Sequence, residues 1–289
     1  MPGSRVPAGS GPSAGSGLSP PSGLSPASGT SGPAGQPPGN SPEPVVSGAP
    51  AATQAANATA VLPSARKPSA RPLAGKIIGI DPGHNGGNFS DPAYINRLIW
   101  NGVADETCDT TGTQTAGGYT EAQFNFNVAR DLRRDLIKDG ARVVMTRNSD
   151  NGVGPCVTRR AQIINDAHAN VAIDIHADGG PAWGRGFTVL EPVAVGPNDK
   201  VIATSARFGA DVKAALLRDT TMPASDYYGN GGVIQRDDLA GLNLTTVPKI
   251  LVECGNMPNA TDAALLTSPA FQAELAGAFT AAIIEYLTS

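Results

Sequence analysis

Residues 77–84 read IIGIDPGH, a run of apolar, largely β-branched residues that ends in Asp-Pro-Gly-His. Two later stretches have the same pattern of apolar residues followed by a polar or charged one: residues 171–178 (VAIDIHAD) and residues 250–255 (ILVECG). Each pattern predicts a buried strand that ends beside a side chain able to bind a metal or to transfer a proton. These three stretches therefore predict a sheet whose strand ends carry the chemistry of the protein.

Helical patterns alternate with these strands. In residues 120–139, Thr120 is suited to cap the helix, apolar residues recur every four positions, and Gly140 ends it. The alternation predicts one α/β domain with a mostly parallel, twisted sheet of about six strands and helices on both faces. Further helices are expected at 94–100, 158–169, 201–217 and 269–287, and further strands at 142–147, 186–191 (an edge strand) and 233–236.

Ligands of such sheets bind beyond the carboxyl ends of the parallel strands. His84, His176 and Glu253 lie at or just past these ends, and Glu121 opens the helix after Thr120. Two histidines and a glutamate, with a second glutamate held apart, are typical of an open catalytic zinc site with a general base. The chain has 3 histidines in all, so two of them at strand ends is informative.

Each of these residues also has a structural interpretation. His84 could be a turn histidine bonded to the backbone. Glu121 could be an acid that the dipole of its helix favours at the N-terminus. Glu253 could form an ion pair with Arg147 or Arg160.

Neighbouring side chains extend the predicted site. Strand alternation places Asp174 on the same side as His176, and Asp81 is expected to hydrogen-bond the imidazole of His84. His168 lies in the predicted helix at 158–169 and is expected to be a surface or capping residue. Glycine pairs at 86–87 and 179–180 are expected to leave room for a bulky substrate.

Composition divides the chain near residue 72. Residues 1–72 are rich in Pro, Gly, Ser and Ala, which predicts a disordered tail, and residues 73–289 are expected to form the globular domain that carries the candidate catalytic site. That domain has 17 basic and 24 acidic residues, which argues against nucleic acid as a partner. No apolar run is long enough to predict an integral membrane segment, and no export signal follows Met1.

The three cysteines leave two interpretations open. Cys108 and Cys156 lie in loop-like stretches near the predicted site and could form a disulfide, which would imply an oxidising compartment. Long loops such as residues 85–118 are usually functional or held by a crosslink. The alternative is three free thiols, and Cys254 stays single in either case.

Several motifs together resemble the zinc-dependent N-acetylmuramoyl-L-alanine amidases of the Amidase_3 type, which are bacterial cell-wall hydrolases. The resemblance spans the globular part and is greatest to small mycobacterial and actinobacterial members, which have paired cysteines beside the site. The motifs are IDPGHNGG (80–87), GYTEAQFNFNVA (118–129), TR (146–147), RRAQIIND (159–166), IDIHADGG (173–180) and LVECGNMPNATDAALL (251–266).

This resemblance implies a Zn²⁺ ion held by His84, Glu121 and His176, with Glu253 as the catalytic acid/base. It implies hydrolysis of the amide between N-acetylmuramic acid and L-alanine in peptidoglycan or muropeptides. We expect a monomer in the periplasm or cell wall, or a secreted protein. The alternatives are a catalytically silent peptidoglycan-binding regulator on the same fold and a zinc peptidase of the stem peptide.

Overall fold

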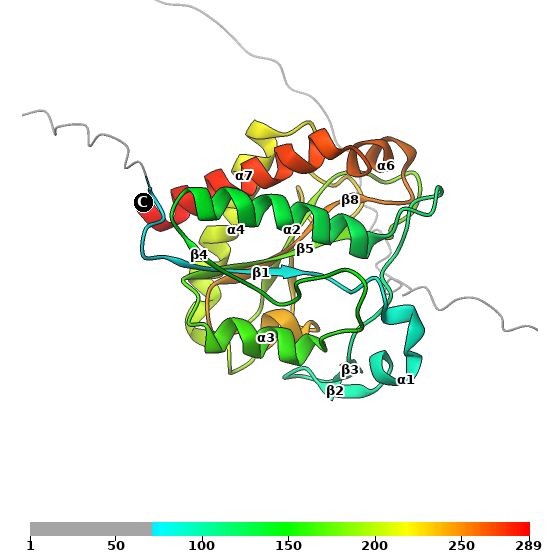
Figure 1. Cartoon of the computed structure of the whole chain (residues 1–289), viewed down its shortest axis with the longest axis horizontal. Helices are drawn as coiled ribbons and strands as arrows, with labels where there is room; N and C mark the ends of the chain where they lie inside the picture. The colour runs from blue at the N-terminus through cyan, green and yellow to red at the C-terminus, as the bar shows by residue number, and fades with distance from the viewer. Residues whose placement is uncertain (1–70) are drawn as a thin grey trace, which may run out of the picture. The chain divides into compact units, whose positions relative to one another are not determined.

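The computed structural model describes residues 71–289, so the predicted tail lies almost wholly outside the described range. A six-stranded sheet with the order β4-β1-β5-β8-β6-β7 forms the centre of this part (Figure 1). All of its strand pairs are parallel except β6 with β8, which confirms the predicted fold class. The strands are β1 (Ile77–Pro82), β4 (Arg142–Met145), β5 (Val171–Asp178), β6 (Thr188–Pro192), β7 (Val233–Arg236) and β8 (Lys249–Asn256).

Helices cover both faces of the sheet. Figure 1 shows α2 and α7 on one face and α3 on the other, and α4 packs against α7 and β6. Among residues 71–289, no helix is long and apolar enough to cross a membrane. The helices are α1 (Pro92–Ile95), α2 (Glu121–Lys138), α3 (Val157–Asp166), α4 (Ile202–Asp219), α5 (Ala240–Asn243), α6 (Ala260–Leu266) and α7 (Pro269–Thr288).

The helix that carries Glu121 forms as the sequence predicts. The side chain of Thr120 accepts a hydrogen bond from Gln123 N and caps α2. The predicted apolar stripe is fully buried against the sheet and α7, and this packing fixes the direction in which the first turn of α2 points. The stripe consists of Phe124, Val128, Leu132 and Leu136.

Two predictions about local structure were wrong. The strand expected at 186–191 is β6, and it lies inside the sheet between β8 and β7 with all five residues buried. The edge strands are β4 and β7. β6 pairs antiparallel with β8, and the alternation of strands and helices along the chain does not indicate such a pairing.

The helix expected at 94–100 is shorter. Asp91 caps α1, Asn96 ends it, and the chain then forms a small antiparallel hairpin of β2 (Leu98–Trp100) and β3 (Asp105–Thr107).

Truncation of the buried stripe tests the packing of α2. We expect Leu132→Ala to lower the free energy of unfolding by about 2–5 kcal/mol, because it removes a fully buried side chain and leaves a cavity. Leu217→Ala, at a position in α4 that is 51% exposed, is the matched control and should cost less than about 0.5 kcal/mol. Urea denaturation of both variants measures the difference, and equal costs would contradict the packing described.

Candidate active site

Three predicted ligand residues converge at the carboxyl end of the sheet. His84 follows β1, Glu121 is the first residue of α2, and His176 lies in β5. One ligand atom from each lies within 4.8 Å of the others, and they form the one group of three metal-capable side chains found among residues 71–289. Segments more than 90 residues apart in the chain thus build one candidate metal centre.

The Glu121 carboxylate lies between the two imidazoles. Its Oε2 atom is 3.2 Å from His84 Nε2, and its Oε1 atom is 2.8 Å from His176 Nδ1. Backbone amides of Thr113 and Ala177 donate to the same oxygens at 3.0 and 3.2 Å. Four-coordinate zinc with bonds of ~2.1 Å needs donors roughly 3.4 Å apart. The three candidate donor atoms, all within 4.8 Å of one another, lie close enough for small shifts to reach that separation.

Two glycines make this approach sterically possible. A Cβ atom at Gly83 would lie 2.1 Å from His176 Nε2, so no other residue leaves space for that ring. At Gly112, where φ is +70°, a Cβ atom would lie 2.7 Å from Glu121 Oε2 and from His84 Cδ2. His84 itself has φ +55°, a left-handed conformation that is uncommon for a residue with a side chain.

The other nitrogen of each imidazole also lies next to an oxygen atom. His84 Nδ1 lies 3.2 Å from Thr110 O and 3.4 Å from Asp109 Oδ1. His176 Nε2 lies 3.4 Å from Asp174 Oδ1. Such contacts orient histidine ligands toward a metal.

The predicted contact from Asp81 to His84 is wrong. Asp81 Oδ1 accepts a hydrogen bond from Thr146 Oγ1 at 2.6 Å and pairs with Arg160, and its other oxygen pairs with Lys249. Asp109 and Thr110 take the expected place beside His84. Sequence reasoning missed both, because they lie in a long loop without periodicity.

Carboxylates that contact the two imidazoles favour a cation at this site. Glu121 contacts both histidines, Asp109 contacts His84, and Asp174 contacts His176. Burial alone would lower the pKa of His84, but Glu121 and Asp109 outweigh it and raise that pKa to about 9. The same field attracts a metal ion.

Glu253 lies beside this centre. It pairs with His176 in the register of β5 and β8, and its Oε2 atom is buried without a hydrogen-bond partner among the described residues. Burial raises the pKa of Glu253 to about 8. The alternative ion pair does not form, since Arg147 pairs with Asp150 and Arg160 with Asp81. A carboxyl group in this state suits proton transfer near neutral pH.

A bulge follows Glu253 in the same strand. β8 uses three steps from Glu253 to Asn256 where β5 uses two from His176 to Asp178, and bulges of this kind are frequent beside active sites. Beyond the bulge, Asn256 Nδ2 donates at 2.7 Å to the carbonyl oxygens of both Pro181 and Gly184. The strand that carries Glu253 therefore also holds the loop that follows β5.

That loop contributes to a pair of packed aromatic side chains, Trp183 and Tyr227, which we call the aromatic wall and which the sequence did not predict. Trp183 is 73% exposed and packs edge-on against Tyr227, whose hydroxyl donates to Asp178 Oδ2 at 2.6 Å. The ring of Tyr227 fills the space where a Cβ atom at Gly180 would lie. This glycine therefore serves close packing of the wall, and the expectation that it leaves room for substrate was wrong.

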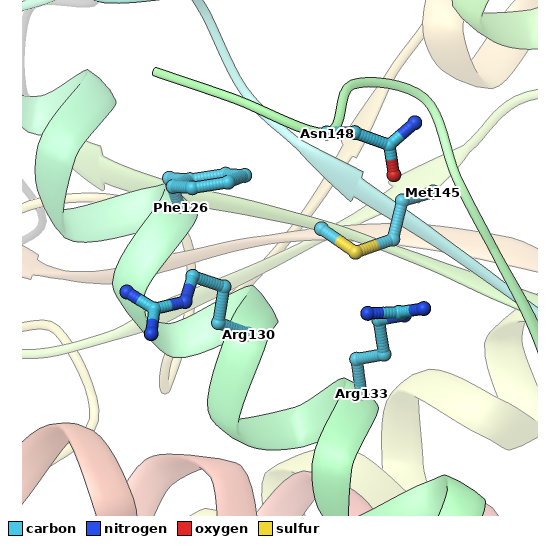
Figure 2. Close-up of a pocket in the computed structure, with 5 residues that line it drawn as sticks. All are labelled: Phe126, Arg130, Arg133, Met145 and Asn148. Atoms are coloured by element: carbon cyan, nitrogen blue, oxygen red, sulfur yellow. The ribbon is translucent and has the colours of Figure 1, made fainter.

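Two other features lie apart from the site. His168 is exposed, as predicted, but it lies after the end of α3 rather than within the helix, at the opposite end of β5 from His176. A surface pocket between α2 and the end of β4 contains none of the candidate metal or catalytic residues (Figure 2). Its lining residues are Phe126, Arg130, Arg133, Met145 and Asn148.

The three cysteines are free and buried in the structure, so the predicted disulfide is not formed there. Cys108 and Cys156 are nevertheless neighbours. The backbone amide of Val157 donates to Cys108 O at 2.8 Å, and the two thiols are within hydrogen-bond reach. Burial, with the neighbouring thiol, raises the pKa of Cys108 to about 12.

Comparison with known proteins agrees with this geometry. Residues 78–285 match the Amidase_3 family, described as N-acetylmuramoyl-L-alanine amidase. The N-acetylmuramoyl-L-alanine amidase Rv3717 of Mycobacterium tuberculosis is 38% identical over 241 residues, which cover 81% of this chain and 95% of that protein. The germination-specific N-acetylmuramoyl-L-alanine amidase of Bacillus subtilis is 28% identical, covering 77% of this chain and 84% of that protein.

Solved structures show the same fold. The apo form of the amidase Ami1 from Mycobacterium abscessus has 40% identity and a TM-score of 0.70, and covers 74% of this chain and 100% of its own. Ami1 from Mycobacterium smegmatis has 38% identity and a TM-score of 0.71, with 75% and 98% covered. The chain therefore belongs to the Amidase_3 family and is an N-acetylmuramoyl-L-alanine amidase, a hydrolase.

Substitution of Gly83 tests the steric account of the site. We expect Gly83→Ala to displace the His176 ring and to reduce both amidase activity and metal content by at least about tenfold, as loss of an orienting contact does. Gly277→Ala, in an exposed position of α7 where a Cβ atom meets nothing within 4 Å, is the control and should leave both unchanged. Activity and bound metal are measured on both variants, and a fully active Gly83→Ala protein would contradict the geometry.

Proposed function

We propose that this amidase is zinc-dependent and that His84, Glu121 and His176 hold the ion. The observation that carries the proposal is the convergence of their three ligand atoms within 4.8 Å, with Glu253 opposite His176 in the neighbouring strand. The chemistry of the donors supports zinc, since imidazole and carboxylate in a set of three are typical of catalytic zinc sites that keep one position open.

In the proposed reaction, water attacks the carbonyl carbon of the amide between N-acetylmuramic acid and L-alanine. A zinc ion supplies Lewis-acid polarisation and acidifies water when it is bound. Glu253 accepts the proton from the attacking water and then delivers it to the leaving alanine nitrogen as the carbon–nitrogen bond breaks. The burial that raises the pKa of Glu253 suits it to act first as base and then as acid.

The aromatic wall supports peptidoglycan or muropeptide as the substrate. Trp183 lies on the loop that Asn256 of β8 holds, and most of its indole is exposed. Its neighbour Tyr227 donates a hydrogen bond to Asp178, two residues after His176. We propose that the sugar or the stem peptide packs against Trp183. Because this substrate belongs to the cell wall, we place the protein in the periplasm or cell wall, or outside the cell, as a monomer with the tail at residues 1–72.

Digestion of purified peptidoglycan tests the proposal. Metal-free protein should be inactive, and addition of one equivalent of zinc should restore activity and release peptides that begin with free L-alanine, as mass spectrometry of the digest will show. Cleavage within the stem peptide would identify a peptidase instead. Binding without any cleavage in the presence of zinc would identify a silent regulator.

A variant of Glu253 separates its role from metal binding. Glu253→Gln should lower kcat by about 10²–10⁴-fold, the usual contribution of a general acid–base group, while zinc stays bound. Glu274→Gln, at an exposed position of α7, is the control and should be fully active. Unchanged turnover by Glu253→Gln would refute the assigned role.

We further propose that Cys108 and Cys156 form a disulfide in an oxidising compartment. Their thiols are adjacent, and a bridge would tie the long loop that carries Asp109 and Thr110 to the start of α3. Protein prepared under oxidising conditions and then unfolded should show one free thiol, that of Cys254, against three after reduction. Three free thiols in the oxidised sample would exclude the bridge.

A further inference from the structure

An unbroken series of buried charged groups runs beneath the candidate metal site from one histidine to the other. On the first side, Asp109 lies 3.4 Å from His84 Nδ1 and 3.1 Å from Arg160, and Arg160 lies 3.1 Å from Asp81. Arg160 also donates to the backbone carbonyl of His84 at 2.7 Å. Several contacts therefore hold the His84 side of the site.

The His176 side depends on fewer contacts. Lys249 Nζ lies 2.8 Å from Asp81 Oδ2 and 3.3 Å from Asp174 Oδ2. The other oxygen of Asp174 faces His176 Nε2 at 3.4 Å and has no hydrogen-bond partner among the described residues. Lys249 is thus the one cation that contacts the carboxylate behind His176 in the described structure.

The burial of Lys249 makes this arrangement unusual. Lys249 is the first residue of β8, and its side chain is 1% exposed, a position at which an unpaired ammonium would be strongly destabilising. Gly241 of α5 closes the space below it, since a Cβ atom there would lie 3.3 Å from both Asp174 Oδ2 and Lys249 Nζ. The ammonium keeps its charge because two carboxylates face it.

We propose that Lys249 is a positioning residue that fixes the imidazole of His176 for metal binding by holding Asp174. The inference rests on the proposed metal site. Its contact with Asp81 joins the two sides, so that β1, β5, β8 and α3 present both histidines as one rigid unit. In the described structure, Lys249 Nζ contacts Asp81 and Asp174 and neither histidine. Asp174 is the one of these two that contacts a histidine, so it carries the effect of Lys249 to the metal site.

The sign of one substitution distinguishes positioning from simple electrostatics. Lys249 carries a positive charge near the site, so its removal would strengthen the binding of a cation if the charge alone mattered. If Lys249 positions Asp174, Lys249→Met should instead weaken zinc binding by about 10–100-fold, the range expected for loss of a contact behind a metal ligand. Competition with a chelator measures the zinc dissociation constant of the full chain.

A double variant tests the path through Asp174. Lys249→Met in the Asp174→Ala background should cause no further loss of zinc affinity, because the residue through which Lys249 acts is already absent. The double variant also removes both members of a buried pair, so it keeps the test valid if Lys249→Met alone is too unstable to purify. Lys138→Met, at an exposed position in the last turn of α2, is the control and should bind zinc normally.

The possible outcomes distinguish failure of the role of Lys249 from failure of the proposed zinc site. Absence of stoichiometric zinc in the unsubstituted protein would refute the metal site itself. Unchanged or tighter zinc binding by Lys249→Met, or an equal further loss in the Asp174→Ala background, would overturn only the role of Lys249. Zinc binding by the double variant as tight as that of the unsubstituted protein would overturn it as well.

Discussion

The Glu121 carboxylate is 4% exposed and lies between two imidazoles, and the surrounding structure has to compensate for its burial. Burial opposes ionisation, yet His84 and His176 hold the pKa of Glu121 well below its usual range. Two backbone amides complete its hydrogen bonds. Because a buried charge is tolerated only when it is paired and hydrogen-bonded, the loop before α2, the end of β1 and the end of β5 must meet at this point.

The same requirement extends below the site, where charges of opposite sign alternate. Arg160 and Lys249 each contact two carboxylates, so each of these buried cations is paired with groups of opposite sign. Removing one member of this group would leave another buried charge unpaired, which is strongly destabilising. The layer therefore tolerates few single substitutions, and its mutual contacts make it rigid. Rigidity of this kind is what a site needs to hold ligands in a fixed geometry.

Much of the fold and the site could be predicted because the strand patterns end in residues of distinctive chemistry. The apolar runs at β1, β5 and β8 predicted a parallel sheet, and its topology placed His84, His176 and Glu253 at one end. The place of β6 could not be predicted, since insertion of an antiparallel strand depends on pairing partners distant in the chain. The roles of Asp109 and Lys249 were missed because a loop has no periodicity and a lysine at the start of a strand usually lies at the surface.

The bulge in β8 divides two tasks along one strand. Glu253, the proposed acid/base group, lies before it, and Asn256 after it donates hydrogen bonds to the main-chain carbonyls of Pro181 and Gly184. Every residue has a carbonyl oxygen, whatever its side chain. The side chains of the loop can therefore change while the hydrogen bonds from Asn256 to its main chain remain. The exposed surface that Trp183 offers can therefore change while the strand that carries Glu253 stays the same.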